Sequence, residues 1–222
     1  MPAPRKALFL DRDGVINIDH GYVCTPARTD FVDGIFALCT HAQALGYWLI
    51  VATNQAGIAR GYFSETDFNA YMEWMRGVFR EHGIEFTAVY HCPHHASEGL
   101  GVYRIACDCR KPAPGMLLQA MREHALDASA CALIGDKDSD IDAGRAAGVG
   151  CLIRLDASAA MATSSTRPDP ETVISLREAQ RVLEECSRLQ ILRPSASGRP
   201  TRPKGVPFRD DRRKSSGEVP KG

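Results

Sequence analysis

The 222-residue sequence has neither an excess of charge of one sign nor a long apolar run. Its 27 Lys and Arg balance 27 Asp and Glu, so the net charge gives no reason to expect a nucleic acid or an anionic membrane as partner. The longest apolar runs, such as Ala7–Leu10 and Trp48–Ala52, are too short to cross a bilayer. Arg5 and Lys6 are not followed by the apolar stretch of a signal peptide, so we expect a cytoplasmic protein.

A dinucleotide-binding fingerprint is also missing. Gly99 and Gly101 have the spacing of its first two glycines, but no third glycine and no predicted helix follow them. We therefore expect no nicotinamide or flavin dinucleotide site.

Cysteine, in contrast, occurs eight times. Eight cysteines could form four disulfides in a secreted protein, but this chain is long, has no export signal, and most of its cysteines stand alone among apolar residues. We therefore expect reduced cysteines, with a metal as the reason for any cluster. Cys39, Cys131 and Cys151 lie in apolar runs and are interpreted as packing residues.

Composition divides the chain into two parts. Residues 1–192 have the pattern of one globular domain. Residues 193–222 contain nine Lys and Arg against three Asp and Glu, a net +6, and Phe208 is their only aromatic residue. Such a segment cannot bury enough apolar surface to offset its ordering entropy, so we predict a disordered basic tail. A solvated tail is favoured over an arm that binds an acidic partner.

Short apolar segments alternate with helical patterns along the globular part. We expect strands at 7–10, 48–52, 86–90, 131–134 and 151–153, and helices at 32–45, 64–82, 114–126, 138–147 and 175–186. Ser64 with Asp67, and Ser175 with Glu178, have the spacing of helix-capping pairs. This order predicts an α/β fold, a three-layer Rossmann-like parallel sheet with helices on both faces.

Polar residues stand where the predicted strands end. Asp11 and Asp13 end the first strand, and residues i and i+2 of an extended chain point to the same side, so their carboxylates share a face while Arg12 points away. Two carboxylates this close need a cation between them or a shared proton. Either arrangement is useful, as a Mg²⁺ site or as a nucleophile beside an acid.

The other predicted ends add a complementary set of groups. Thr53-Asn54-Gln55 end the second strand, Lys111 precedes the third helix, and Asp136 ends the fourth strand. Because the carboxyl ends of parallel strands meet at one edge, these groups should converge there. Taken singly, each is more often a helix cap, a turn residue or a solvated charge. Together, carboxylates, a hydroxyl and a lysine suit phosphoryl transfer.

Four segments, FLDRDGVIN, VATNQ, CRKP and LIGDKDSD, resemble the four motifs of the haloacid dehalogenase superfamily and occur in the same order. INIDHGYV, TNQAGIARG, YHCPHH and CDCRKPAPGML extend the resemblance to the heptose bisphosphate phosphatases of that superfamily. It implies hydrolysis of the 7-phosphate of D-glycero-D-manno-heptose 1,7-bisphosphate through an aspartyl phosphate, in nucleotide-heptose synthesis for bacterial surface polysaccharide. Histidinol-phosphate phosphatases resemble the same motifs and are the alternative.

The resemblance also implies a role for each motif residue. Asp11 would be the nucleophile, Asp13 the acid and then the base, and Thr53 and Lys111 would hold the phosphoryl group. Mg²⁺ would bind Asp11, the backbone carbonyl of Asp13, and Asp136, while Asp140 could orient Lys137. The substrate-contacting residues would be Asp19, His20, Gly21, Tyr22, Asn54, Gln55, Arg110 and Lys137. Only 41 residues separate Asp11 from Thr53, which leaves no room for a cap domain.

A second cluster has the composition of a structural zinc site. Cys92, His94, Cys107 and Cys109 offer three thiolates and one imidazole, which would close a tetrahedral Zn²⁺ site with no position open for water. His91 and His95 are rival ligands by spacing, and the resemblance favours His94. Because Cys109 adjoins Arg110 and Lys111, this zinc would fix the loop that presents them.

Two other function classes are open at this point. A zinc-loop binding module on an inactive phosphatase scaffold is disfavoured, because Asp11, Asp13, Lys111 and Asp136 are all present. A DNA-end phosphatase would explain the basic tail, but residues 1–192 carry a net −6. We therefore expect a monomer that acts on a small sugar phosphate, with no nucleic acid or membrane partner.

Overall fold

The computed structural model describes residues 5–158 and 170–192 of the chain. The strands are β1 (Lys6–Leu10), β2 (Tyr47–Asn54), β3 (Phe86–Cys92), β4 (Ala132–Gly135), β5 (Cys151–Leu155) and β6 (Glu171–Val173). The α-helices are α1 (Ile35–Ala44), α2 (Ala56–Ala59), α3 (Glu65–Glu81), α4 (Gly115–His124), α5 (Asp138–Ala146) and α6 (Leu176–Leu192). Short 3₁₀ turns are η1 (Pro26–Arg28), η2 (Gly101–Tyr103) and η3 (Ala128–Ala130). The predicted tail, 193–222, lies outside the described residues.

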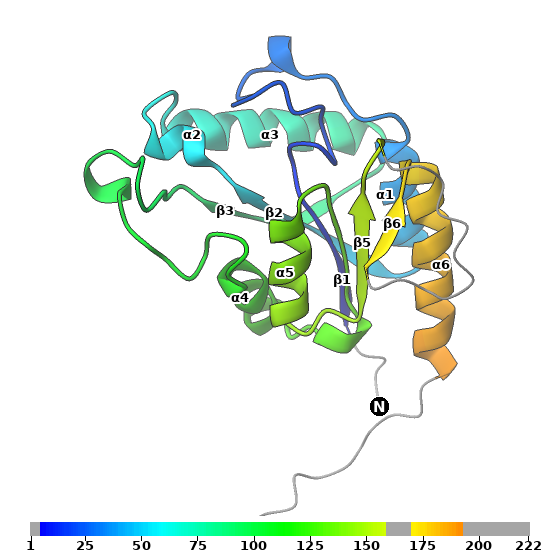
Figure 1. The fold of residues 1–222 in the computed structure, drawn as a ribbon. Helices are drawn as coiled ribbons and strands as arrows, with labels where there is room; N and C mark the ends of the chain where they lie inside the picture. The colour runs from blue at the N-terminus through cyan, green and yellow to red at the C-terminus, as the bar shows by residue number, and fades with distance from the viewer. Residues whose placement is uncertain (1–4, 159–169, 193–222) are drawn as a thin grey trace, which may run out of the picture. The chain divides into compact units, whose positions relative to one another are not determined.

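The six strands form one parallel sheet in the order β3-β2-β1-β4-β5-β6 (Figure 1). The chain builds outward from β1 through β2 to β3, returns to place β4 on the other side of β1, and then continues to β5 and β6. The direction of winding therefore reverses between β1 and β4. In open α/β sheets, the crevice beyond the carboxyl ends of such a pair is where ligands bind.

Alternating residues of each central strand feed two separate cores. Leu8 and Leu10 of β1 belong to the core that includes residues of α1, α3 and α6. Ala7 and Phe9 belong to the core that includes residues of α4 and α5. The sheet is thus covered on both faces, which confirms the predicted three-layer fold (Figure 1).

Most predicted elements are present, with shifted ends. The capping box of α3 is confirmed, since the Ser64 hydroxyl accepts the Asp67 N–H and the Asp67 carboxylate accepts the Ser64 N–H. Helix α1 begins at Ile35 instead of Val32, because Gly34 has a φ of +86° and interrupts the helical backbone. Strand β6 was not predicted, and α6 extends six residues beyond the predicted end at residue 186.

The prediction that Cys151 is a reduced packing residue is wrong. Cys151, at the start of β5, forms a disulfide with Cys186 of α6, and their Cα atoms lie 6.3 Å apart, within the range that a disulfide spans. The pair is 35 residues apart in sequence, so only the packing of α6 on the sheet brings it together. Cys39 and Cys131 are buried free thiols, as expected for packing residues.

Two further expectations concern what the fold contains. Between Asp11 and Thr53 the chain forms only η1, α1 and most of β2, so no cap domain is inserted there. Within residues 5–158 and 170–192, none of the helices is both long enough and apolar enough to span a membrane.

Candidate active site

An ammonium and two carboxylates meet at the switch point between β1 and β4. The Lys111 amine lies 2.9 Å from Asp11 Oδ1, 2.6 Å from Asp140 Oδ1 and 2.7 Å from the Ala52 carbonyl. All three N–H donors of the amine therefore have acceptors. The Lys111 side chain is only 3% exposed, so this contact fixes the position of the Asp11 carboxylate.

The electrostatics of this cluster are dominated by its acidic side. Burial would lower the pKa of Lys111, but Asp11 and Asp140 outweigh it and raise that pKa. Burial, and then the charge of Asp11, raises the pKa of Asp140. Burial raises the pKa of Asp136 to about 6, and Asp11 and Asp140 add to the rise. The negative charge of Asp11, Asp136 and Asp140 therefore exceeds the positive charge that Lys111 brings to the cluster.

The same residues suit a divalent cation. Asp11, Asp136 and Asp140 each place an oxygen within 4.8 Å of the others. Asp136 Oδ1 is buried and has no hydrogen-bond partner among the described residues. Gly14, with a φ of +92°, must be glycine, because a Cβ there would come within 2.3 Å of Asp136 Oδ2. A cluster of carboxylate oxygens, one of them without a hydrogen-bond partner among the described residues, suits the hard cation Mg²⁺. Asp140 is a third carboxylate in this cluster, beside the predicted ligands Asp11 and Asp136.

Asp13 lies beside this cluster and is held by three other side chains. Arg12 Nη2 lies 2.6 Å from Asp13 Oδ2 and 2.8 Å from Oδ1, and Arg12 Nε lies 3.2 Å from Oδ1. Asn17 Nδ2 donates to Oδ1 at 3.0 Å, and Gln55 Nε2 donates to Oδ2 at 3.2 Å. The sequence placed Arg12 away from the site, and the ion pair with its own neighbour was not foreseen.

The residues at the end of β2 hold other residues of the site in place through hydrogen bonds. The Thr53 side chain is fully buried, and its hydroxyl accepts a hydrogen bond from Gln55 Nε2 at 2.8 Å. Asn54 pins the loop that carries Lys111, because its amide donates to the Lys111 carbonyl and accepts the Lys111 N–H, both at 3.0 Å. Asn54 therefore positions the lysine in addition to facing the site.

These groups surround a hollow of about 300 Å³. It is lined by Asp11, Asp13, Asp19, Gly21, Tyr22, Asn54, Gln55, Ala56, Gly57, Lys111, Lys137, Ser139 and Asp140. Of the residues expected to contact the substrate or its phosphoryl group, His20, Arg110 and the fully buried Thr53 lie outside this lining. Ala56, Gly57 and Ser139 were not foreseen, although Ser139 lies within the quoted segment LIGDKDSD. Both Asp11 and Asp13 line the hollow, as their i, i+2 spacing predicts.

The loop from Asp19 to Tyr22 closes one side of the hollow. Asp19 accepts the Gly21 N–H and pairs with the Lys137 amine at 3.2 Å. Lys137 also lies 3.7 Å from Asp136 Oδ2, and its backbone N–H donates to Asp140. Asp140 thus orients the Lys137 backbone, as expected, but its carboxylate pairs with Lys111. His20 turns outward to Asp30, at 2.8 Å.

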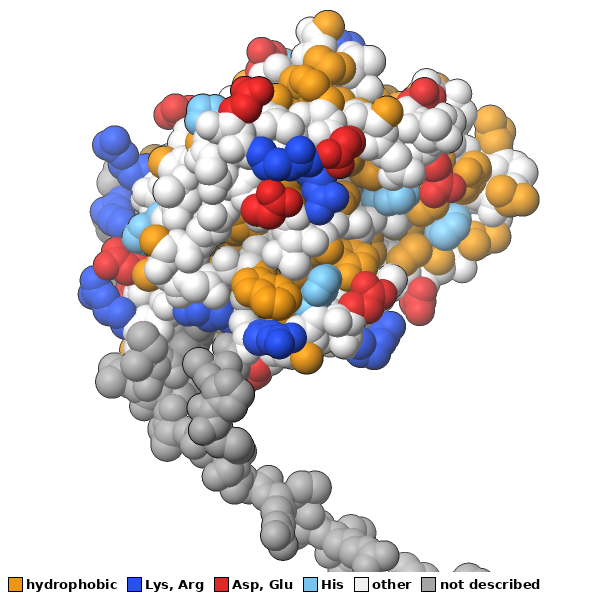
Figure 2. All heavy atoms as spheres, turned by 180° about the vertical axis from the view of Figure 1, so that it is seen from behind, with side chains coloured by type: hydrophobic (Ala, Val, Ile, Leu, Met, Phe, Trp, Pro, Cys, Tyr) orange, Lys and Arg blue, Asp and Glu red, His pale blue; other side chains and the backbone are white. Residues whose placement is uncertain are grey.

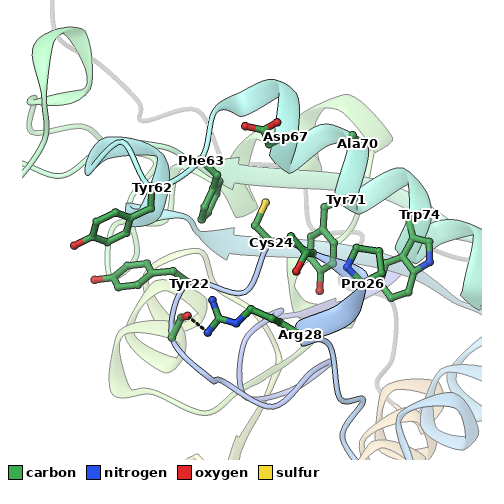
Figure 3. A pocket seen from close by; sticks show the side chains of 12 residues that line it. Tyr22, Cys24, Pro26, Arg28, Tyr62, Phe63, Asp67, Ala70, Tyr71 and Trp74 are labelled. Atoms are coloured by element: carbon green, nitrogen blue, oxygen red, sulfur yellow. Dashed lines mark hydrogen bonds between the residues drawn. The ribbon is translucent and has the colours of Figure 1, made fainter.

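A larger hollow of about 570 Å³ lies on the other side of this loop (Figure 3). Aromatic rings dominate its wall, with Tyr71 and Trp74 of α3 stacked 5.6 Å apart and Tyr22 packed edge-on against Tyr62. Arg28 donates to the carbonyls of His20 and Gly21 and so holds the loop in place. Gly21 and Tyr22 line both hollows, so the loop is the wall between them.

The four predicted zinc ligands come together between β3 and α4. Cys109 Sγ lies 3.3 Å from Cys92 Sγ, 3.2 Å from Cys107 Sγ and 3.5 Å from His94 Nδ1. Ligands of a tetrahedral zinc with Zn–S bonds of about 2.3 Å would be separated by about 3.8 Å, so the set needs little rearrangement to bind Zn²⁺. The rival histidines have other partners: His91 contacts Glu65, and His95 accepts the Glu98 N–H.

The cysteine cluster is tied directly to the candidate active site. Arg110 Nη1 donates to the His94 carbonyl at 3.1 Å, and the next residue is Lys111. The loop between the ligand pairs exposes Leu100 and Val102, and Figure 2 shows hydrophobic side chains at the edge of the molecule where this loop lies. Elsewhere on that face, Lys and Arg are interspersed with Asp and Glu (Figure 2).

Comparison with known proteins gives a consistent set of relatives. A family model described as HAD-hydrolase-like matches residues 108–179. D-glycero-alpha-D-manno-heptose-1,7-bisphosphate 7-phosphatase of Burkholderia mallei is 51% identical over 173 residues, which cover 76% of this chain and 92% of the relative. The beta-anomer 7-phosphatase of Vibrio cholerae is 48% identical over 149 residues, covering 67% and 80%.

Solved structures share the architecture. A HAD-like protein from Mesorhizobium loti has a TM-score of 0.74 and 32% identity, covering 91% of each chain. D,D-heptose 1,7-bisphosphate phosphatase from B. bronchiseptica, complexed with magnesium and phosphate, has a TM-score of 0.68 and 26% identity, covering 82% of this chain and 98% of that one.

Proposed function

Since the chain belongs to the haloacid dehalogenase-like phosphatases, we propose that it hydrolyses the 7-phosphate of D-glycero-D-manno-heptose 1,7-bisphosphate. The observation that carries this proposal is the Asp11–Lys111–Asp140 cluster, which faces a hollow at the sheet's switch point. The 51% identity to a heptose bisphosphate phosphatase over almost all of that relative's length supports the substrate. Cytoplasmic nucleotide-heptose synthesis for bacterial surface polysaccharide is the corresponding role.

The chemistry is divided between two carboxylates. Asp11 attacks the phosphorus of the 7-phosphate, and the bond to the sugar oxygen breaks while Asp13 gives that oxygen a proton. Asp13 then takes a proton from a water molecule, which attacks the aspartyl phosphate and releases phosphate and free Asp11. Lys111 contacts the attacking carboxylate and supplies positive charge for the phosphoryl oxygens.

A magnesium ion would be held by Asp11, Asp136 and the backbone carbonyl of Asp13, with Asp140 beside them. When bound, it neutralises charge on the phosphoryl oxygens. The buried, unpartnered Asp136 oxygen and the acidic excess of the site support such an ion. Zn²⁺ would be held by Cys92, His94, Cys107 and Cys109 as a structural ion.

The second phosphate of the substrate would be held at the outer end of the hollow. Lys137 lines that hollow, and Arg110 stands outside the lining, where its Nη1 donates to the His94 carbonyl. An arginine can hold a phosphate through two parallel hydrogen bonds. Histidinol phosphate would instead need an acidic contact for its amine, and Asp19 is already paired with Lys137.

A phosphate-release screen tests the substrate. Both anomers of the heptose bisphosphate, histidinol phosphate and a 3′-phosphorylated oligonucleotide are compared by kcat/KM, with Asp11→Asn as the inactive control. We expect the bisphosphate to be far the best substrate, and Arg110→Ala to raise its KM. Comparable efficiency on histidinol phosphate would overturn the assignment.

A further inference from the structure

The largest fully buried side chain among the described residues is a charged one, Arg12, with no exposed surface. Burying an ion is costly unless a counter-charge and hydrogen bonds compensate it. Within the described part of the chain, the ion pair of Arg12 is with Asp13, through three contacts of 2.6 to 3.2 Å. The core thus contains a cation whose counter-charge is the residue assigned to proton transfer.

The guanidinium is held rigidly from behind. Its Nη2 also donates to the Val23 carbonyl at 2.7 Å. Its central carbon lies 5.2 Å from the centre of the Tyr71 ring and 5.6 Å from that of Phe68, both on α3. Stacking on aromatic faces and a fixed planar fork leave the guanidinium little freedom to turn.

Asn17 and Gln55 also contact Asp13, but one side of its carboxylate stays open to the catalytic hollow. Asn17 donates to Oδ1 and Gln55 to Oδ2, so Oδ1 has three contacts and Oδ2 has two. The Asp13 side chain keeps 15% of its surface exposed and lines the catalytic hollow, whereas neither Arg12 nor Asn17 lines it. Arg12 and Asn17 therefore act on the hollow indirectly, and Asp13 is the lining residue whose carboxylate both of them contact.

We propose that Arg12, assisted by Asn17, is a positioning residue that fixes the Asp13 carboxylate for proton transfer. Arg12 contacts both oxygens of Asp13 and Asn17 contacts Oδ1, so the two side chains together hold the carboxyl group in one orientation at the edge of the hollow. This inference rests on the proposed function, in which Asp13 protonates the leaving group. Misplacing a catalytic group by about 1 Å can cost on the order of 100-fold in rate, so such a cradle has a large kinetic effect.

The test compares leaving groups. A primary alkyl phosphate, such as the sugar substrate, needs a proton on its leaving oxygen, whereas 4-nitrophenyl phosphate releases a stable anion and does not. The quantity measured is kcat/KM, which reports the step in which the leaving group departs. Arg12→Met should lower kcat/KM about 100-fold for the alkyl phosphate, the scale of general acid catalysis, and less than about 5-fold for the aryl phosphate.

Equal losses on the two substrates would show that Arg12 is merely structural and would overturn the proposal. Should Arg12→Met fail to fold, Asn17→Ala decides, with a smaller loss in the same selective direction expected and an equal loss overturning the idea. Arg76→Met is the matched control. Arg76 is a partly buried arginine of α3 that donates to the Phe86 carbonyl, and its loss should leave the ratio of the two substrates unchanged.

The variant Asp13→Asn distinguishes a failure of the positioning role of Arg12 from a failure of the proposed role of Asp13 as the acid. A selective loss on the alkyl phosphate in Asp13→Asn, without one in Arg12→Met, would remove the positioning role and leave Asp13 as the acid. A loss in Asp13→Asn that is equal for both substrates would overturn both assignments.

Discussion

Replacing Lys111 with methionine should destabilise the protein even when no substrate is present. The substitution keeps much of the side-chain volume but removes the ammonium that lies between Asp11 and Asp140, whose side chains are 8% and 2% exposed. Removing one partner of a buried ion pair typically costs about 3–5 kcal/mol, because the other charge stays buried. For a domain of this size about 1 kcal/mol corresponds to about 2–4 °C, so Tm should fall by about 6–20 °C.

The direction of the pH dependence follows from the same cluster. Burial and Asp11 already raise the pKa of Asp140, and Lys111 opposes that rise, so the variant raises it further. A carboxyl with a raised pKa in the folded state is stabilising when protonated, and that stability is lost as the pH rises through the raised pKa. The gap in Tm between wild type and variant should therefore be small near pH 5 and large at pH 8.

The assay is thermal unfolding of zinc-loaded protein prepared in buffers without magnesium. Chelators are avoided, because they would also remove zinc. The double variant Lys111→Met with Asp11→Asn removes one of the stranded charges and should melt above Lys111→Met alone. Added Mg²⁺ should also recover part of the loss. A Lys111→Met protein that melts within about 2 °C of wild type at pH 8 would refute the view that this lysine balances buried charge.

Three further predictions are simpler. Purified protein should contain about one equivalent of Zn²⁺ by metal analysis, and Cys107→Ser should lower Tm because zinc binding is linked to folding; active protein free of zinc would contradict this. The apparent affinity for Mg²⁺, measured by calorimetry, should weaken as the pH falls below about 6. Below that pH Asp136 is protonated and must lose its proton before it can bind the ion. Equal affinity at pH 5 and pH 7.5 would count against Asp136 as a ligand. Truncation after Leu192 should leave kcat/KM and Tm nearly unchanged, and a large loss of either would show that residues 193–222 dock on the domain.

The parts of the fold that the sequence predicts are those with a local signal. Apolar strands, the capping pair of Ser64 and Asp67, and glycines after helices each act within a few residues, so element order and the parallel sheet follow from them. The meeting of Asp11 and Asp136 also follows, because each stands just after a strand and parallel strands bring their carboxyl ends to one edge. Strand β6, with only three residues, is too short to show a periodicity.

The contacts that could not be predicted depend on side-chain packing between distant segments. Asp140 pairs with Lys111 across 29 residues, and Lys111 reaches Asp11 across 100. The Arg12 guanidinium reaches Asp13 while it packs against the rings of Phe68 and Tyr71 on α3, more than 50 residues later in the chain. Period-2 alternation gives the face of a strand on which a side chain starts, but not where a long side chain ends.

The disulfide between Cys151 and Cys186 makes a covalent ring of the segment that holds β5, β6 and most of α6. A protease that cuts the backbone anywhere inside this ring would leave two fragments joined by the sulfur bridge. On a gel run without reductant the cut protein would migrate close to the intact chain, and only reduction would release the C-terminal piece. Mapping of cleavage sites in this part of the protein therefore has to be done with reduced samples.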